Sequence, residues 1–155
     1  MSVEVAYRVS STATGGGRDG HVESGPGRVK LDLQPPVELG GSGRGANPEE
    51  LFSAGYAACF LGALRLVAKN AGVAIPDDAT VTVTAGIGKD LVDNGFGLVA
   101  DIAVSLPGMN QAKADEIAQA AHGFCPYSKA TKGNIAHTVT AVSYTHLTLP
   151  TKRIV

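Results

Sequence analysis

The feature that most constrains this chain is a long apolar segment in the middle of its 155 residues. The sequence NPEELFSAGYAACFLGALRLVAKNAG covers residues 47 to 72, and no charged side chain occurs between Leu51 and Leu64. Asn47 is a favourable N-cap, proline suits the first helical position, and the acidic residues in the first turn oppose the helix dipole. The sequence therefore predicts a helix that begins after Asn47 and ends near Gly72.

This helix is apolar on nearly all sides, so we expect it to be buried on most of them. A chain of this size offers few such places, which favours a second subunit that covers part of the helix. The uncharged run is shorter than the roughly 20 residues that a membrane span needs. No basic and apolar leader opens the sequence, and the net charge is -1. We therefore expect a cytoplasmic protein with neither nucleic acid nor membrane as a partner.

Alternating apolar residues predict strands on both sides of the helix. Val3, Val5, Tyr7 and Val9 alternate near the N-terminus and indicate a half-buried strand. Residues 20–34, GHVESGPGRVKLDLQ, are typical of a hairpin that turns at its Gly-Pro-Gly sequence.

The second half of the chain repeats this plan. Residues 79–88 and 96–106 alternate as two strands, and Asp93-Asn94-Gly95 supplies the turn between them. An amphipathic helix is predicted from Asn110 to about Gly123, and a last strand from 135 to 142.

The predicted order of elements is β-β-β-α-β-β-α-β. Because hairpins make most of the connections, the pattern favours the α+β class with antiparallel sheet. We expect one domain over residues 1–142. Residues 143–155 change abruptly in character and are either native or an extension derived from cloning.

The chain contains two cysteines, Cys59 within the apolar helix and Cys125 in HGFCPYS. Two cysteines in a cytoplasmic protein indicate a redox or catalytic pair, or else two inert core thiols. An apolar neighbourhood raises the pKa of a thiol, and the residues three and four positions from Cys59 carry no positive charge. A reactive Cys59 therefore needs a cation from another part of the fold.

Arg18, displayed on the glycine-rich loop TGGGRDG, is the candidate cation, and Glu49 or Glu50 is the candidate carboxylate to pair with it. In a straight helix Glu49 lies about 15 Å along the axis from Cys59. A helix break at Gly55 is therefore predicted, since it shortens this separation and places Cys59 near a new helix N-terminus.

Cys125 precedes Pro126, which restricts it to extended backbone and suits it to meet an oxidised sulfur. The hypothesis is oxidation of Cys59 by a peroxide to a sulfenic acid, condensation with Cys125, and reduction by an external dithiol. The alternatives are that Cys59 fills the core, that Arg18 is a solvated loop residue, and that the acidic residues only cap the helix.

The remaining polar motifs indicate no further site. The four histidines lack metal-ligand spacing and are interpreted as surface residues or satisfied hydrogen-bond partners: His21, His122, His137 and His146. The glycine clusters GGSGRG and TGGGRDG do not form a phosphate loop that leads into a helix.

Four motifs resemble those of the organic hydroperoxide resistance proteins, the Ohr branch of the Ohr/OsmC family, from about residue 3 to residue 142. They are TATGGGRDG, ELGGSGRGANPEELFSAGYAACFLGAL, GFGLVADIAVSLPG and AHGFCPYSKATKGNI. The resemblance implies a cysteine-based peroxidase that acts on organic and fatty-acid hydroperoxides. It also implies reduction by dihydrolipoamide or lipoylated proteins, with no bound cofactor or metal.

By position in these motifs, the resemblance implies that Cys59 is the peroxidatic thiol and Cys125 the resolving thiol. It implies further that Arg18 activates the thiolate and the peroxide, and that Glu49 holds this arginine. An intertwined homodimer is implied too, with two sheets that enclose central helices. The alternative function is a binding or redox-sensing protein whose apolar pocket carries a hydrophobic ligand without turnover.

Overall fold

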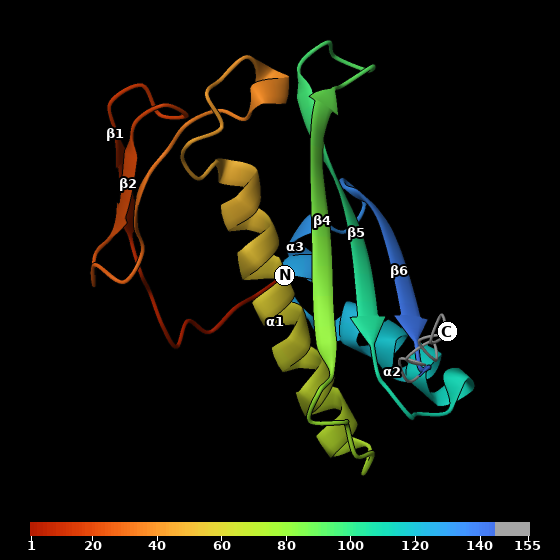
Figure 1. Cartoon of the computed structure of the whole chain (residues 1–155). Coiled ribbons are helices and arrows are strands. Elements are labelled where there is room, and N and C mark those ends of the chain that lie inside the picture. Colours follow the sequence, from red (N-terminus) through yellow and green to blue (C-terminus); the bar gives the residue numbers. More distant parts are fainter. Residues whose placement is uncertain (145–155) are drawn as a thin grey trace, which may run out of the picture. The chain divides into compact units, whose positions relative to one another are not determined.

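The structure is a computed structural model of the chain, and it describes residues 1–144. The chain divides into two compact units, Met1–Leu51 and the residues from Phe52 onward. Figure 1 shows the elements of both units along the chain. The extent of a single domain over residues 1–142 stays a prediction. Most of the atypical segment 143–155 lies outside the described residues.

The first unit contains a small antiparallel sheet of order β1-β2-β3. Its strands are β1 (Ser11–Thr14), β2 (His21–Ser24) and β3 (Lys30–Asp32), and a 3-10 helix, η1 (Val37–Leu39), follows them. The predicted hairpin is confirmed, because β2 pairs with β3 and the turn closes with a hydrogen bond from Gly27 N–H to the Ser24 carbonyl. Gly27 has a φ of 76°, which favours glycine at this position.

The predicted strand over Val3, Val5, Tyr7 and Val9 is wrong for the single chain. Residues 1–10 contain neither helix nor strand, and these four side chains are all exposed. Alternation of apolar residues specifies which face of a strand is buried, but a strand forms only where a neighbour accepts and donates its backbone hydrogen bonds. The apolar face of residues 3–9 is left uncovered as a result.

Helix α1 (Pro48–Asn70) confirms the predicted boundaries. The Asn47 side chain accepts a hydrogen bond of 2.9 Å from the Glu50 backbone N–H. At the other end, Gly72 has a φ of 69° and Val73 N–H donates to the Ala68 carbonyl. By length and hydropathy alone α1 would suffice to cross a membrane, a test that core helices of soluble proteins also pass. Its buried residues join the core of the second unit.

The predicted break at Gly55 is wrong, because α1 continues through this residue. One glycine weakens a helix by about 1 kcal/mol, whereas burial of one large apolar side chain contributes about 1.5–3 kcal/mol. Tyr56 and Phe60, which follow Gly55, are both fully buried. A Cβ atom at position 55 would lie 2.9 Å from the Tyr127 hydroxyl oxygen. The glycine therefore permits close approach of Tyr127 and does not interrupt the helix.

The second unit has a sheet of order β4-β5-β6. Strand β4 (Thr80–Lys89) pairs antiparallel with β5 (Phe96–Ser105) through the predicted turn, where Asn94 has a φ of 64°. Strand β6 (Ala136–Val142) runs parallel to β5, as the arrows in Figure 1 show. The α+β class is thus confirmed, but the sheet is mixed and not wholly antiparallel.

Two helices connect β5 to β6 and explain the parallel pairing. Helix α2 (Gln111–Phe124) was expected, whereas the short α3 (Pro126–Thr131) was not. A parallel neighbour needs a long crossover that returns the chain to the starting edge of the sheet, and these helices provide it. The core that they close contains large, fully buried side chains from α1, β5 and α2: Tyr56, Phe60, Leu64, Ile102, Val104 and Ile117.

Candidate active site

The two cysteines lie next to each other in the second unit. Both are free, and the Cys125 thiol donates to the Cys59 sulfur with 3.7 Å between the two Sγ atoms. A disulfide needs about 2.05 Å between the sulfurs, so a local movement of less than 2 Å separates this pair from a bond. Cys125 is fully buried and Cys59 is half-buried. The structure therefore brings together two thiols that lie far apart in the sequence.

Helix ends fix the backbone of Cys125. Its N–H donates to the Ala121 carbonyl at the end of α2, and its carbonyl accepts from Lys129 N–H at the start of α3. The residue itself has φ -60° and ψ 125°, the extended conformation that Pro126 imposes on its predecessor. Cys125 thus occupies the joint between two helices, and α1 carries Cys59 opposite this joint.

The surroundings of Cys59 within this unit favour the neutral thiol. Burial raises the pKa of the Cys59 thiol, and the neighbouring Cys125 thiol acts in the same direction. The backbone N–H of Tyr127, in the first turn of α3, lowers this pKa but does not reverse the shift. A thiolate at neutral pH therefore requires a positive charge in addition to these groups.

Arg18 and Glu49 form a two-pronged ion pair in the first unit. The arginine Nη1 donates to Glu49 Oε2 at 3.1 Å and its Nη2 donates to Oε1 at 2.5 Å. The hydrogen bond to Arg18 holds the pKa of the Glu49 carboxyl below its usual value, and the same bond raises the pKa of Arg18. The predicted pairing of Arg18 with the first of the two acidic residues is therefore present.

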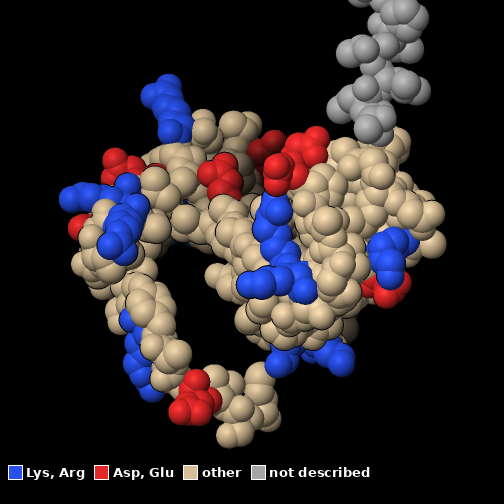
Figure 2. All heavy atoms as spheres, turned by 90° about the horizontal axis from the view of Figure 1, so that it is seen from below, with Lys and Arg blue, Asp and Glu red and all other residues tan. Residues whose placement is uncertain are grey.

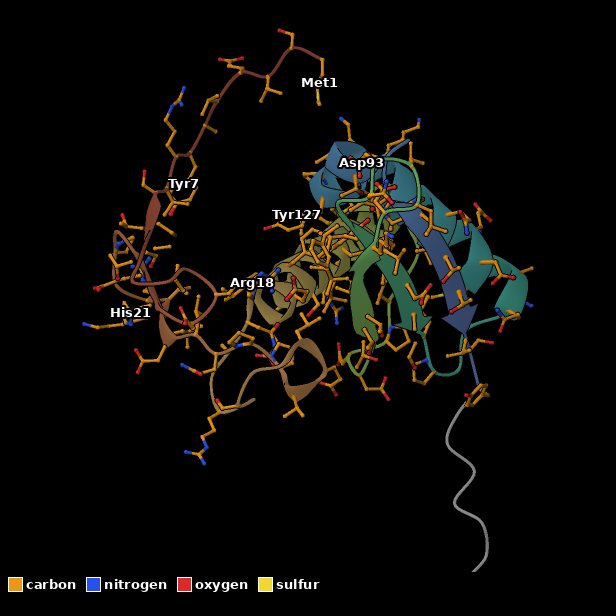
Figure 3. The ribbon with its side chains drawn as sticks, turned by 90° about the horizontal axis from the view of Figure 1, so that it is seen from above. Met1, Tyr7, Arg18, His21, Asp93 and Tyr127 are labelled. Atoms are coloured by element: carbon orange, nitrogen blue, oxygen red, sulfur yellow. The ribbon has the colours of Figure 1, made fainter. Side chains whose placement is uncertain are left out.

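Glycines shape the loop that carries Arg18, the residue labelled in Figure 3. Gly15 and Gly17 have φ angles of 71° and 77°, a region that residues with side chains rarely adopt. A Cβ atom at Gly20 would lie 1.9 Å from the Thr14 carbonyl oxygen. The loop TGGGRDG therefore requires its glycines in order to present the arginine.

A buried hydrogen-bond network lies one helical turn from the cysteines, and sequence reasoning missed it. The Tyr56 hydroxyl lies 2.8 Å from Ser128 Oγ and 3.1 Å from His137 Nε2. Ser128 Oγ also lies 3.0 Å from His122 Nδ1, and Thr131 Oγ1 lies 2.9 Å from His137 Nε2. The interpretation of His122 and His137 as satisfied partners is confirmed. The sequence signal that could have found the network is a hydroxyl residue three positions from each cysteine, Tyr56 before Cys59 and Ser128 after Cys125.

The other features of the described residues suggest no second reaction centre. Among residues 1–144 no group of three or more histidine, cysteine, aspartate and glutamate side chains is placed to hold a metal ion. A hollow of about 690 Å³ lies at the tip of β4 and β5, and neither cysteine lines it. Figure 2 shows basic and acidic side chains interspersed on the visible face.

The chain can be compared with known proteins once this pair of free thiols and the α+β fold are in place. Residues 41–140 match the family model of the OsmC-like proteins. The chain belongs to this family and, within it, to the organic hydroperoxide resistance proteins.

The relatives that place it there cover most of the chain. The organic hydroperoxide resistance protein of Xanthomonas axonopodis pv. citri is 43% identical over 138 residues, which is 88% of this chain and 95% of the relative. The crystal structure of an organic hydroperoxide resistance protein from Elizabethkingia anophelis has a TM-score of 0.85 at 42% identity, with coverage of 92% and 100%. OhrB of Bacillus subtilis, also a crystal structure, has a TM-score of 0.80 at 39% identity, with coverage of 89% and 100%.

Proposed function

We propose that the protein is a thiol-dependent peroxidase that reduces organic and fatty-acid hydroperoxides to alcohols. The Cys59 thiolate attacks the distal peroxide oxygen, the O–O bond breaks, and the alkoxide leaves with a proton as the alcohol. Cys59 is thereby oxidised to a sulfenic acid. The Cys125 thiol then attacks the sulfenic sulfur, the S–S bond forms, and hydroxide leaves with the thiol proton as water. Cys59 is the peroxidatic residue and Cys125 the resolving residue.

The observation that carries this proposal is the 3.7 Å separation of the two sulfurs. A resolving thiol must reach the sulfenic sulfur before a second peroxide does, and proximity of this kind converts the encounter into a fast intramolecular step. Burial of Cys125 supports the same order of events, because a fully buried thiol is poorly placed to meet peroxide first. Names of the relatives, which refer to organic hydroperoxide resistance, agree with such a substrate.

In this proposal Arg18 supplies the positive charge that Cys59 lacks within its own unit. A guanidinium stays charged when water is removed, and its planar N–H groups also orient a peroxide oxygen. Glu49 holds this guanidinium through the two-pronged pair and so fixes the direction in which its other N–H groups point. Activation of Cys59 by Arg18 is an inference from chemistry and from the family resemblance.

The apolar surroundings of Cys59 support a preference for peroxides with alkyl chains. Partly buried apolar residues of α1, among them Phe52, Leu61 and Cys59 itself, pack against the core of the second unit. Burial of an alkyl chain contributes about 25 cal/mol for each Å² of apolar surface removed from water. Hydrogen peroxide has no chain and gains none of this free energy, so efficiency is expected to rise with chain length.

Regeneration of the thiols requires an external dithiol. A dihydrolipoyl group, free or on a lipoylated protein, attacks the Cys59–Cys125 disulfide and leaves as the cyclic lipoyl disulfide, returning both thiols. Two electrons enter from the dithiol in each cycle and two leave to the peroxide. We propose no bound cofactor or metal, and a cytoplasmic location for this chemistry.

The proposal includes an intertwined homodimer. Helix α1 exposes a stripe of small and apolar residues at four-residue spacing: Ala54, Ala58, Gly62 and Leu66. Residues 3–9 expose an alternating apolar face that has no strand partner among residues 1–144. A second copy would cover both surfaces at once. Light scattering coupled to size exclusion chromatography tests this, and a monomer at micromolar concentration would contradict it.

The decisive experiment is turnover of cumene hydroperoxide with dihydrolipoamide, with Cys59→Ser as the control. We expect sustained turnover by the wild type and none by Cys59→Ser, and about one equivalent of alcohol per subunit from Cys125→Ser without added thiol. A wild type that binds hydrophobic ligands but never turns over would instead indicate the binding or redox-sensing function.

A further inference from the structure

The network around Ser128 forms a second link between α1, which carries Cys59, and α3, which begins directly after Cys125. On α1, Tyr56 precedes Cys59 by three residues, and on the other side Ser128 follows Cys125 by three. Residues three apart in a helix lie on one face, about one turn from each other. The contact between Tyr56 and Ser128 therefore runs alongside the contact between the two sulfurs, at 2.8 Å and 3.7 Å respectively.

Side chains from four elements hold Ser128 and Tyr56 in this contact. His122 on α2 lies 3.0 Å from Ser128 Oγ, and His137 on β6 lies 3.1 Å from the Tyr56 hydroxyl. Thr131 closes the other end of α3, because its hydroxyl lies near His137 and donates to the carbonyls of Tyr127 and Ser128. Short α3 is thus tied at both ends to its neighbours.

Because these side chains are buried, a lost hydrogen bond is not readily replaced by water. Tyr56 and Ser128 are 0% and 2% exposed, and no buried side-chain nitrogen or oxygen among the described residues lacks a hydrogen-bond partner. Loss of the Ser128 hydroxyl takes the contact at Nδ1 from His122 and one of two contacts from the Tyr56 hydroxyl, and loss of the Tyr56 hydroxyl removes the direct contact between α1 and Ser128. A buried polar group that loses a hydrogen bond favours movement of the element that can replace it, here α3. Such a movement changes the position of Cys125, since its carbonyl accepts the first hydrogen bond of α3.

We infer that Tyr56 and Ser128, supported by His122 and His137, are positioning residues for the resolving thiol. They hold Cys125 within reach of the Cys59 sulfur, so that the sulfenic acid is converted to a disulfide before a second peroxide oxidises it to a sulfinic acid. Their effect falls on the second chemical step and not on the first. This inference rests on the proposed function and concerns a different step of the same reaction.

Single-turnover kinetics of Ser128→Ala and Tyr56→Phe separate the two steps. The rate of peroxide attack is measured as the loss of the Cys59 thiol. The amount of sulfenic acid is measured by trapping with dimedone and mass spectrometry. We expect attack within about twofold of wild type and disulfide formation slowed roughly tenfold or more, as small misplacements of reacting groups produce. The peroxide concentration that gives half over-oxidation should fall by the same factor.

Thr138→Ala is the matched control. Thr138 lies beside His137 on β6, and its exposed hydroxyl donates a hydrogen bond to Asp101. The variant should leave both steps and the over-oxidation threshold unchanged. His122→Asn, which retains an acceptor near the Nδ1 position, should restore most of the rate that His122→Leu loses. Tyr56→Phe preserves the buried ring and decides the matter if Ser128→Ala does not fold.

Two outcomes overturn the inference. One is disulfide formation at the wild-type rate in a folded Tyr56→Phe variant, and the other is an equal loss of rate in Thr138→Ala. Failure of the proposed function is recognised earlier and separately, since a wild type that yields no sulfenic acid with cumene hydroperoxide has no second step to compare.

Discussion

The pair of sulfurs and the pair of charged groups lie in different parts of the chain and have opposite surroundings. Cys59 and Cys125 are enclosed by helices and apolar side chains, which brings them together but makes ionisation of Cys59 unfavourable. Arg18 and Glu49 stand at a glycine-rich loop and a helix start, and the arginine side chain is 43% exposed. Burial disfavours the charged form of a thiol, whereas a charged group near water keeps its hydration. In the proposed function, the charged pair supplies the positive charge that the surroundings of Cys59 lack.

The largest effect on the reactivity of Cys59 is expected from Arg18→Ala. Without the guanidinium, burial alone governs Cys59, so its pKa should rise further and peroxide attack should slow by about 10²-fold. The rate of thiol loss measured between pH 6 and 10 gives both quantities. Arg44→Ala, which removes a second arginine from a glycine-rich loop, serves as the control and should change neither. An unchanged Cys59 titration together with an unchanged rate of peroxide attack in Arg18→Ala would remove Arg18 from the mechanism.

A smaller effect is expected from Glu49→Gln, which keeps the shape of the side chain but removes its charge. Arg18 loses one prong of a charge-assisted pair, and we expect roughly tenfold slower peroxide attack with little change in the amount of folded protein. Glu50→Gln makes the same change at the neighbouring acidic residue and should have at most a twofold effect. Equal rates for the two variants would contradict the distinction between Glu49 and Glu50.

In the wild type, the contribution of the Arg18–Glu49 pair to the free energy of unfolding should depend on pH. The folded pKa of Glu49 lies below its ordinary value of 4.5, so the pair contributes fully above that pH. Its contribution is lost as the pH falls through the folded pKa. In Glu49→Gln this part of the acid dependence of unfolding should be absent.

The smallest effect concerns His122 in the second unit. Burial lowers the pKa of His122, and the positive charges of His137 and Lys132 lower it further. Above the ordinary value of 6.5 the imidazole is neutral in both the folded and unfolded states and contributes no pH dependence. Below it the unfolded chain takes up a proton that the folded chain resists, so the free energy of unfolding should decrease from pH 6.5 down to the folded pKa.

Urea unfolding at pH 7.5 and pH 5.5 measures this difference. The wild type should lose stability between the two values, and His122→Asn should lose less. A His122→Asn variant with the wild-type pH dependence would show that another group titrates in this window.

Local patterns were sufficient to predict much of the secondary structure, and the exceptions have one cause. The cap at Asn47, the turns at Gly27 and Asn94, and the helix after Asn110 depend on residues close together in the chain, so sequence reasoning found them. The strand expected over residues 3–9 depends on a neighbouring strand, which the described part of the chain does not provide. Non-local pairing is the information that alternation lacks.

The candidate site shows the same division. The family motifs marked Cys59, Cys125, Arg18 and Glu49, while the roles of these four residues remain proposals. The continuous course of α1 through Gly55 was not foreseen, because the constraint on that glycine comes from Tyr127, far along the chain. Helix α3 was missed for a related reason, since its six residues are too few to form a helix without tertiary contacts.

The amino-acid sequence by itself determined an apolar central helix with a thiol inside it, a second thiol held extended before a proline, and an arginine on a loop that only glycines can form. The 3.7 Å between the sulfurs and the parallel return of β6 were decided by the tertiary structure alone, as was the buried contact of Tyr56 with Ser128. Local properties depend on backbone dihedral preferences and neighbouring side chains, which short sequences specify. Distances between remote residues depend on how whole elements pack, and packing is a property of the complete core.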